Sequence, residues 1–256
     1  MMKFRSIAVL AGIIALASCD KNAVQDITGV VPAAKIRFFN FALGAPSVNF
    51  FANDAKVTAV LSTAGTPLST GVAQGGVASG GLYTGVAPGT YQFSSQISDT
   101  TIKNVTVTKV SQKVEAGKTY SFFMSGLYDV VARTAEGFII EDAYPAAFDY
   151  TQAYVRFVNA IYNADAMTLY AKNQTTGVEI PVGGAVAYKA GGIFAPVLTG
   201  IYDLSTRVAG SPTNVIVRTG VSFVLGNVYT VAARGDITVV STTLANRPQL
   251  DLTLNR

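Results

Sequence analysis

A short segment near the start of the chain recurs in its second half. Residues 35–40 read KIRFFN and residues 154–159 read YVRFVN, so the arginine, the phenylalanine and the asparagine keep their places. Further matches follow in the same order, with Gly80, Gly81, Gly89 and Tyr91 repeated as Gly191, Gly192, Gly200 and Tyr202, and with Gly117, Tyr120 and Gly126 repeated as Gly226, Tyr229 and Gly235. Ordered matches over about 100 residues predict two copies of one folding unit.

Within each copy the dominant period is two, which is typical of strands. In the first segment Ile36 and Phe38 would share one face of a strand, with Arg37 on the other, and the second segment repeats this around Arg156. The alternation continues in other short runs: Val48 and Phe50, Tyr91 and Phe93, Tyr120, Phe122 and Met124, Val215 and Val217, and Val221 and Phe223. No long segment after residue 19 has a helical period, so each copy is predicted to be a sandwich of two antiparallel sheets.

The expected boundaries divide the chain into six parts. They are a signal peptide at 1–18, a lipidated N-terminus and tether at 19–33, a first sandwich at 34–145, a linker at 146–152, a second sandwich at 153–252 and a tail at 253–256. Each sandwich is long enough to bury a core of its own.

The first residues have the three-part order of a secretory signal. A basic start with Lys3 and Arg5 precedes an apolar run and small residues. The run is too short for a spanning helix, which needs about 20 residues. Residues 16–19 read LASC and resemble the bacterial lipobox, in which the cysteine is acylated and becomes the new N-terminus. The alternative is that Cys19 is a small residue beside a conventional cleavage site.

Lipid attachment at Cys19 would place the protein in the bacterial cell envelope. Two or three acyl chains give stable membrane attachment, whereas one chain gives marginal binding. We expect the outer membrane, at its periplasmic face or at the cell surface. The inner membrane stays an alternative because Asp20, directly after the cysteine, favours retention there under the enterobacterial sorting rule.

The composition excludes several kinds of chemistry. The chain has no histidine and one cysteine, so it lacks the residues for Ser-His-Asp and Cys-His catalysis, for histidine metal sites and for internal disulfides. We therefore expect no enzyme, no cofactor and no metal. No run of Lys or Arg marks a nucleic-acid groove, so no nucleic-acid partner is expected.

Several motifs have a plain structural interpretation. Residues 117–119 read GKT and imitate the end of a phosphate loop, but the earlier glycine is missing, which favours a hairpin turn. The glycine-rich stretch from Gly65 to Gly89, which overlaps a glycine-rich insertion of the first copy at 62–81, is expected to form flexible loops around a strand, with a binding edge as the alternative. Residues 99–101 read DTT and resemble the O-glycosylation signal of some Bacteroidota, with an exposed loop as the plainer interpretation.

The charged candidates also admit structural roles. Glu141 and Asp142 are adjacent, so in a strand they would point to opposite faces. The oxygen-bearing groups at 53–54 and 163–165 suit turns better than a calcium loop. Arg37 and Arg156 occupy the same position of the repeat, and we expect each to pair with a local carboxylate or backbone carbonyl.

The opening strands resemble the bacterial domain of unknown function 4397, as do the strands with the motif Gly-x-Tyr at Tyr91 and Tyr202 and the strands with the motif Gly-x-x-Tyr at Tyr120 and Tyr229. The resemblance covers 34–145 and 153–252, as tandem copies in a lipoprotein. It implies immunoglobulin-like sandwiches and brings no catalytic residues. The expected function is a non-catalytic binding or adhesion module for a protein or glycan. The alternative is a purely structural spacer or assembly subunit of the envelope.

Overall fold

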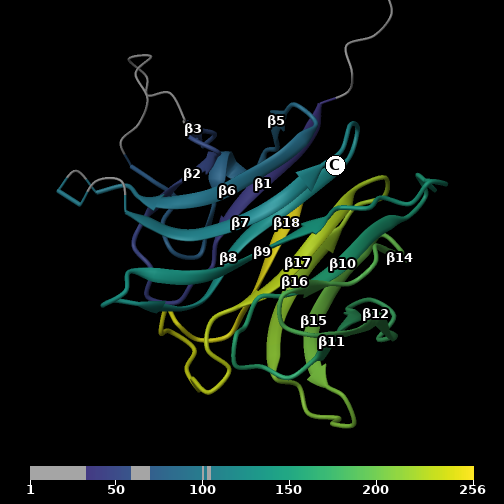
Figure 1. Ribbon diagram of the computed structural model, residues 1–256. Coiled ribbons are helices and arrows are strands. Elements are labelled where there is room, and N and C mark those ends of the chain that lie inside the picture. The colour runs from purple at the N-terminus through teal and green to yellow at the C-terminus, as the bar shows by residue number, and fades with distance from the viewer. Residues whose placement is uncertain (1–32, 59–69, 100, 103–104) are drawn as a thin grey trace, which may run out of the picture. The chain divides into compact units, whose positions relative to one another are not determined.

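Nearly all the regular structure of the chain is β-strand (Figure 1). The computed structural model describes residues 33–58, 70–99, 101–102 and 105–256. Within these residues the one element that is not a strand is a short 3-10 turn, η2 (Ala78–Gly81). No helix in this part of the chain has the length and apolar character needed to cross a membrane. The prediction of an all-β fold is confirmed.

Several predicted features lie outside the described residues. They include the signal peptide at 1–18, the acylation site Cys19, nearly all of the tether and the part of the glycine-rich insertion before residue 70. The remainder, Ala33–Arg256, forms one compact unit.

The first half of this unit contains two sheets. One is built from β1 (Ala34–Asn40), β4 (Gly76–Val77), β5 (Thr84–Val86), β8 (Thr119–Asp129) and β9 (Thr134–Glu141). The other is built from β2 (Val48–Ala52), β3 (Ala55–Lys56), β6 (Gly89–Ile97) and β7 (Thr106–Val114). Their strand orders are β4-β1-β8-β9, with β5 also paired to β1, and β3-β2-β6-β7.

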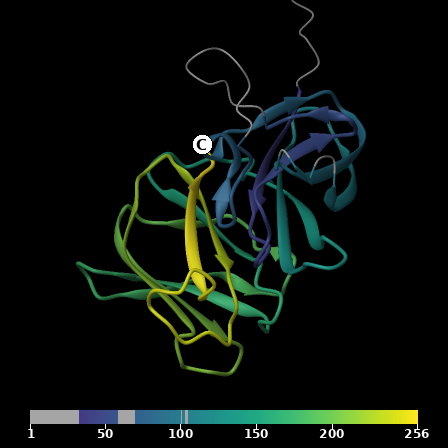
Figure 2. The same ribbon diagram turned by 90° about the vertical axis from the view of Figure 1, so that its left-hand side faces the viewer.

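The second half repeats this arrangement. One sheet contains β10 (Ala153–Asn159), β13 (Ala190–Gly191), β14 (Ala195–Val197), β17 (Val228–Arg234) and β18 (Gln249–Leu254). The other contains β11 (Met167–Asn173), β12 (Glu179–Val186), β15 (Gly200–Val208) and β16 (Ile216–Phe223). The orders are β13-β10-β17-β18, with β14 also on β10, and β12-β11-β15-β16. Figure 2 shows the purple-to-teal first half and the green-to-yellow second half as separate groups of strands.

One pairing in each half differs from the antiparallel sheets that were expected. β1 runs parallel to β8, with Arg37 opposite Ser121, and β10 runs parallel to β17, with Arg156 opposite Thr230. Parallel neighbours need a long crossover connection, and here the crossover passes through the second sheet of the same half. Alternation in the sequence predicts which face of the sheet each side chain occupies. It does not predict whether the neighbouring strand runs parallel or antiparallel.

Each half has its own apolar core between its two sheets. Ile36 and Phe38 point into the first core, where the rings of Phe38 and Phe50 lie 5.0 Å apart. Val155 and Phe157 occupy the same places in the second core. Both pairs are at most 1 % exposed, as the alternation predicts. Two sheets facing one another across a closed core form a β-sandwich, which agrees with the immunoglobulin-like prediction.

A third apolar cluster joins the two sandwiches. It contains Phe39, Phe41, Phe123 and Phe138 from the first and Val158, Ala160 and Ala232 from the second. The rings of Phe39 and Phe123 stack with centroids 4.4 Å apart. We call this contact, together with the polar network at its side, the seam.

β1 and β10 run in the same direction along the seam. Near the starts of both strands, Arg156 of β10 donates to the carbonyl of Glu141. Glu141 lies opposite Tyr120 of β8, and Tyr120 lies opposite Ile36 of β1. Near their far ends, Ser125 Oγ lies 3.0 Å from the hydroxyl of Tyr188, beside Asn159. Both strands therefore begin at the same end of the molecule, which we call the entry end.

Two strands depart from the expected pattern. Val217, expected to point inward, is 57 % exposed, and Ile216 is buried instead. On β16, Thr219 and Gly220 lie opposite Asp203 alone, and this bulge changes the phase of the alternation. β18 runs to Leu254, so the tail expected from residue 253 begins later.

Candidate functional site

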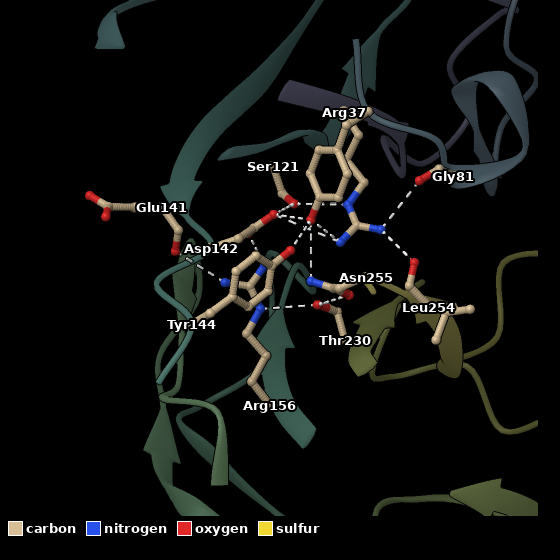
Figure 3. A network of polar contacts seen from close by, with 11 residues as sticks. Arg37, Gly81, Ser121, Glu141, Asp142, Tyr144, Arg156, Thr230, Leu254 and Asn255 are labelled. Atoms are coloured by element: carbon tan, nitrogen blue, oxygen red, sulfur yellow. Dashed lines mark hydrogen bonds and ion pairs between the residues drawn. The ribbon is translucent and has the colours of Figure 1, made fainter. Parts of the chain in front are cut away.

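The two repeated arginines meet in a buried polar network at the seam (Figure 3). Arg37 is the fourth residue of β1, and Arg156 is the fourth residue of β10. Because side chains alternate along a strand, both point away from their own core and toward the other sandwich. They converge on Asp142, directly after β9, and the side chains of all three residues are at most 2 % exposed.

Asp142 is the shared acceptor of the network. Its Oδ1 accepts a hydrogen bond from Nη2 of Arg156. Its Oδ2 accepts hydrogen bonds from Ser121 Oγ, at 2.8 Å, and from the hydroxyl of Tyr83. Nη2 of Arg37 lies 3.7 Å from the same oxygen. One carboxylate therefore forms ion pairs with both arginines.

Each arginine also binds a main-chain carbonyl of the other sandwich. Arg156 Nη1 donates to the carbonyl of Glu141 at 3.1 Å, and Arg37 Nη1 donates to the carbonyl of Leu254 at 3.1 Å. Glu141 ends β9 and Leu254 ends β18. The partners are therefore exchanged, since the first strand of each sandwich is tied to the last strand of the other.

The network has an approximate two-fold correspondence. Matching positions hold Arg37 and Arg156, Ser121 and Thr230, Tyr83 and Phe194, and Asp142 and Asn255. In each sandwich the hydroxyl accepts from the arginine Nε, at 3.3 Å in the first and 3.0 Å in the second. The aromatic ring lies over the guanidinium, with Cζ 4.2 Å and 4.7 Å from the ring centroids. The halves differ by one carboxylate and one phenol hydroxyl.

Two guanidinium groups share one carboxylate in this network. Carbonyl oxygens accept hydrogen bonds from the guanidinium groups, and aromatic ring faces lie against them, which stabilises the positive charge that the single carboxylate does not neutralise. Asn255, at the position that matches Asp142, accepts from Thr230 at 2.9 Å and donates to the hydroxyl of Tyr83 at 3.3 Å. Because an uncompensated buried charge is costly, the network depends most on Asp142.

Burial keeps the phenols of the network protonated. The hydroxyl of Tyr83 donates to Asp142, accepts from Arg37 and lies 3.0 Å from the hydroxyl of Tyr144. Burial, and then the negative charge of Asp142, raises the pKa of Tyr83 far above its usual value of about 10. Burial also raises the pKa of Tyr144. At neutral pH Tyr83 is therefore a hydrogen-bond donor to the carboxylate.

The asparagine of the repeated motif acts at the opposite end of the strand. Asn40 Nδ2 donates to the carbonyls of Pro46 and Val72, at 3.0 and 2.9 Å. Asn159 Nδ2 donates to the carbonyl of Val186 at 3.2 Å. In the repeated motif, the arginine thus serves the seam, the phenylalanine serves the core and the asparagine fixes the loops at the far end.

A cavity of about 410 Å³ lies at the far end of the first sandwich, opposite the entry end. Its lining includes Pro46, Ser47, Ile97, Ser98, Asp99, Tyr128 and Arg133. The volume is in the range of small-ligand sites, which are about 300 to 1,000 Å³. One aromatic ring, one guanidinium and one carboxylate at the same cavity can contact a ligand that is polar on its edges and apolar on its faces.

The other predicted motifs form turns. Gly117 has a φ of 74° in the turn between β7 and β8, which belong to different sheets, so this turn is not the expected hairpin. Asn53 has a φ of 53° in the turn between β2 and β3. Asn163 Nδ2 donates to Asp236 at 2.7 Å and holds a loop. In the described ranges, no three His, Cys, Asp or Glu residues gather as metal ligands.

The acidic candidates separate in the structure. Glu141 is exposed and lies 3.2 Å from Lys118 Nζ, whereas its neighbour Asp142 is buried at the seam. Asp99 is exposed, and hydrogen bonds from Thr101 lower the pKa of its carboxyl. The opposite faces predicted for Glu141 and Asp142 are confirmed.

The two arginines do pair with a carboxylate and with backbone carbonyls, but the prediction that these partners are local is wrong, because the carboxylate is shared and the carbonyls of Glu141 and Leu254 belong to the opposite sandwich. Alternation and the repeat indicated that Arg37 and Arg156 act alike, whereas nothing in either segment indicated one shared carboxylate. A signal was present, because Asp142 and Asn255 each follow the last strand of their copy. Aligning the two copies at their ends would have matched these residues.

Two of the solved structures to which the chain is similar are distant likenesses, and no curated protein matches the chain. The Bacillus anthracis TIE protein is 13 % identical with a TM-score of 0.24, and the match covers 79 % of this chain. It covers 33 % of the TIE protein, so the chain spans about a third of that protein's length. A candidate cell adhesion protein from Bacteroides ovatus is 9 % identical with a TM-score of 0.23, and the match covers 89 % of this chain and 97 % of that one.

One family model matches a large part of the chain. The model described as "Domain of unknown function (DUF4397)" matches residues 34–170, more than half of the sequence. The match begins with β1 and continues through β10 into β11, past the expected end of the first sandwich at 145. It therefore includes Arg37, Asp142 and Arg156. The chain belongs to the DUF4397 family.

Proposed function

We propose that the protein is a membrane-anchored, non-enzymatic lipoprotein of the bacterial cell envelope that binds a protein or a glycan. The LASC box and the basic start of the chain support an anchor at Cys19. The favoured location is the outer membrane, at its periplasmic face or at the cell surface, with the inner membrane as the second candidate. The absence of histidine from the sequence supports a binding role over an enzymatic one.

The observation that carries the binding role is the cavity at the far end of the first sandwich. Tyr128 offers an aromatic ring, and Arg133 and Asp99 offer a donor group and an acceptor group beside it. Sugar rings and peptide side chains both combine apolar faces with polar edges, so the cavity suits either. In a protein anchored at residue 19, the cavity lies at the end of the first sandwich opposite the start of β1.

We also propose that the second sandwich is a second copy of the family domain. The strand order of residues 153–254 repeats that of residues 34–141. Arg156 and Asn159 have the same roles as Arg37 and Asn40. A folding test of each half alone would not decide this, because the seam joins them, so the appropriate check is a comparison of aligned copies across family members.

Binding at the cavity can be tested with the purified chain. Titrations against a glycan array and against cell-envelope peptides should give a saturable signal that Tyr128→Ala and Arg133→Ala each reduce at least tenfold. The matched control is Tyr170→Ala with Arg207→Ala, a partly buried tyrosine and arginine on the second sandwich, where the guanidinium Cζ lies 4.2 Å from the ring centroid. Equal loss in the control variants, or turnover of a substrate abolished by one carboxylate substitution, would contradict the proposal.

The alternative function is a structural spacer or assembly subunit. It is favoured by the seam, which ties the two sandwiches through buried ion pairs and an apolar cluster. A spacer needs a fixed geometry and no ligand. A saturable ligand at the cavity would count against this alternative, and normal envelope assembly in a strain lacking the protein would exclude it.

The location can be tested by protease treatment of intact cells. Cys19→Ala serves as the unanchored control, and a periplasmic marker reports whether the envelope stayed sealed. Digestion from outside would indicate surface display. Protection until the outer membrane is opened would indicate a periplasmic face and favour an assembly role.

A further inference from the structure

Three loops at the entry end of the second sandwich carry no charge. Residues 174–178 join β11 to β12 and read QTTGV. Residues 198–201 lead from β14 into β15 and read LTGI, and residues 224–227 join β16 to β17 and read VLGN. None of these three segments contains Asp, Glu, Lys or Arg.

Apolar side chains at these loops are exposed. The set, with exposed fractions of 47 to 67 %, is Tyr150, Val178, Leu198, Ile201, Val224 and Leu225. We call it the apolar end. Single exposed apolar residues are ordinary, whereas a group gathered at one end of a domain indicates a contact surface.

Hydrogen bonds show that the loops are neighbours. The backbone N–H of Gln174 donates to the carbonyl of Ile201 at 2.9 Å, which joins the first loop to the second. Ile201 is opposite Ser222 of β16, close to the third loop. The N–H of Gly226 donates to the carbonyl of Gln152 at 2.8 Å, which joins the third loop to the segment after Tyr150.

Three of the backbone groups next to these side chains are already paired. The carbonyl of Val178 accepts from Asn173 at 2.8 Å, and the carbonyl of Leu198 accepts from the hydroxyl of Tyr202 at 2.9 Å. The N–H of Val224 donates to the hydroxyl of Tyr229 at 3.2 Å. Moving unpaired polar groups into hydrocarbon is costly, and these internal bonds reduce that cost.

The first sandwich is charged at the matching positions. Glu115 and Lys118 replace Val224 and Asn227, as the hydrogen bond from each loop to its tyrosine shows. Lys118 Nζ lies 2.8 Å from Glu115 and 3.2 Å from Glu141. The apolar end is therefore a property of the second sandwich and not of the fold.

The position of β1 indicates what covers the apolar end. β1 and β10 begin at the same end of the molecule, so the chain enters β1 at the end that carries the apolar loops. Residues 19–32 number 14, and a chain of this length spans at most about 50 Å. If Cys19 is acylated, as proposed above, the entry end is held close to the bilayer in which the acyl chains sit.

We infer that the apolar end rests in the lipid surface, with the side chains of Leu198, Val224 and Leu225 inserted below the headgroups. Tyr150 and Arg256, whose Nη2 lies 3.3 Å from the tyrosine hydroxyl, are suited to the headgroup level. The inference rests on the proposed anchor. It orients the molecule, because the cavity of the first sandwich then faces away from the membrane.

The absence of tryptophan from the chain makes a direct test possible. The full lipidated chain carrying Leu225→Trp is reconstituted into vesicles of phosphatidylethanolamine and phosphatidylglycerol with brominated acyl chains. The matched control is Val131→Trp, which replaces a residue that is 90 % exposed in the turn between β8 and β9 at the far end. Leu198→Trp provides a second probe if the first variant does not fold. Flotation of the vesicles measures anchoring in the same samples.

Every variant is expected to float with the vesicles. The tryptophan at 225 should be quenched by the bromolipids and should emit at shorter wavelength. The tryptophan at 131 should show neither change. Flotation without quenching at 225 and 198 would overturn the membrane contact and leave the anchor intact. Quenching at 225 in a chain that mass spectrometry shows to carry no acyl group at Cys19 would overturn the anchor and support the contact. A wavelength shift without quenching would mean that protein covers the patch, for example a second copy, and would overturn the inference.

Discussion

The two sandwiches have the same strand order and contribute different side chains to the seam. The first supplies large rings and a carboxylate, with Phe39 and Asp142 at its face. The second has Val158 and Asn255 at the matching positions. Two identical faces would place ring against ring and two carboxylates in one buried site, whereas a large face against a small one packs without overfilling. Two halves with the same strand order therefore meet through complementary faces.

The largest expected effect comes from moving the charge between the halves. Asp142→Asn leaves Arg37 and Arg156 buried without an anion, so the free energy of unfolding should fall by about 3 to 5 kcal/mol. Adding Asn255→Asp places a carboxylate at the matching position, where Thr230 and Tyr83 already contact the side chain. Urea unfolding of the single and double variants measures both changes.

The double variant should recover part of the loss, since the network is approximately symmetric. Asn255→Asp alone is the control for the cost of adding a carboxylate at that site. A double variant less stable than Asp142→Asn alone would show that the two positions are not equivalent, and the comparison between the halves would fail at its main point.

An effect of equal or smaller size should follow from trimming the apolar face of each half. Phe39→Ala removes a ring stacked on Phe123 and should cost about 3 to 5 kcal/mol. Val158→Ala, at the matching position, should cost about 1 to 3 kcal/mol. Both are measured by the shift of the unfolding midpoint at constant slope. A larger loss of stability for Val158→Ala than for Phe39→Ala would contradict the assignment of the large apolar face to the first sandwich and the small one to the second.

The smallest effect concerns the phenol that distinguishes Tyr83 from Phe194. The pKa of Tyr83 is raised in the folded protein, so the neutral phenol stabilises the fold fully below about pH 10, the usual pKa of tyrosine, and this contribution is lost as the pH rises further. Tyr83→Phe should therefore lose less thermal stability than the unchanged protein between about pH 9 and 11. Tyr150→Phe, at an exposed tyrosine, is the control and should follow the unchanged protein. Parallel curves for all three proteins would contradict the role given to Tyr83.

Much of the fold can be derived from the sequence because strand alternation is a local property. Ile36, Phe38 and their counterparts face the cores as predicted, and the repeated motif indicates two like halves. The seam depends on contacts between distant segments, such as Arg37 with Leu254, and no local pattern encodes these. The bulge at Gly220 is a further example, since one extra residue inverts the faces of the strand before it.

The exchanged carbonyl contacts also have a consequence for the order in which the protein is made. Arg37 is synthesised before its acceptor at Leu254, which follows 217 residues later. During synthesis the first sandwich therefore holds a guanidinium whose acceptor on β18 has not yet been made. Completion of β18 supplies that acceptor, so the buried network closes only once β18 is present. A chain that lacks β18 leaves Arg37 of the first sandwich without its carbonyl acceptor at Leu254.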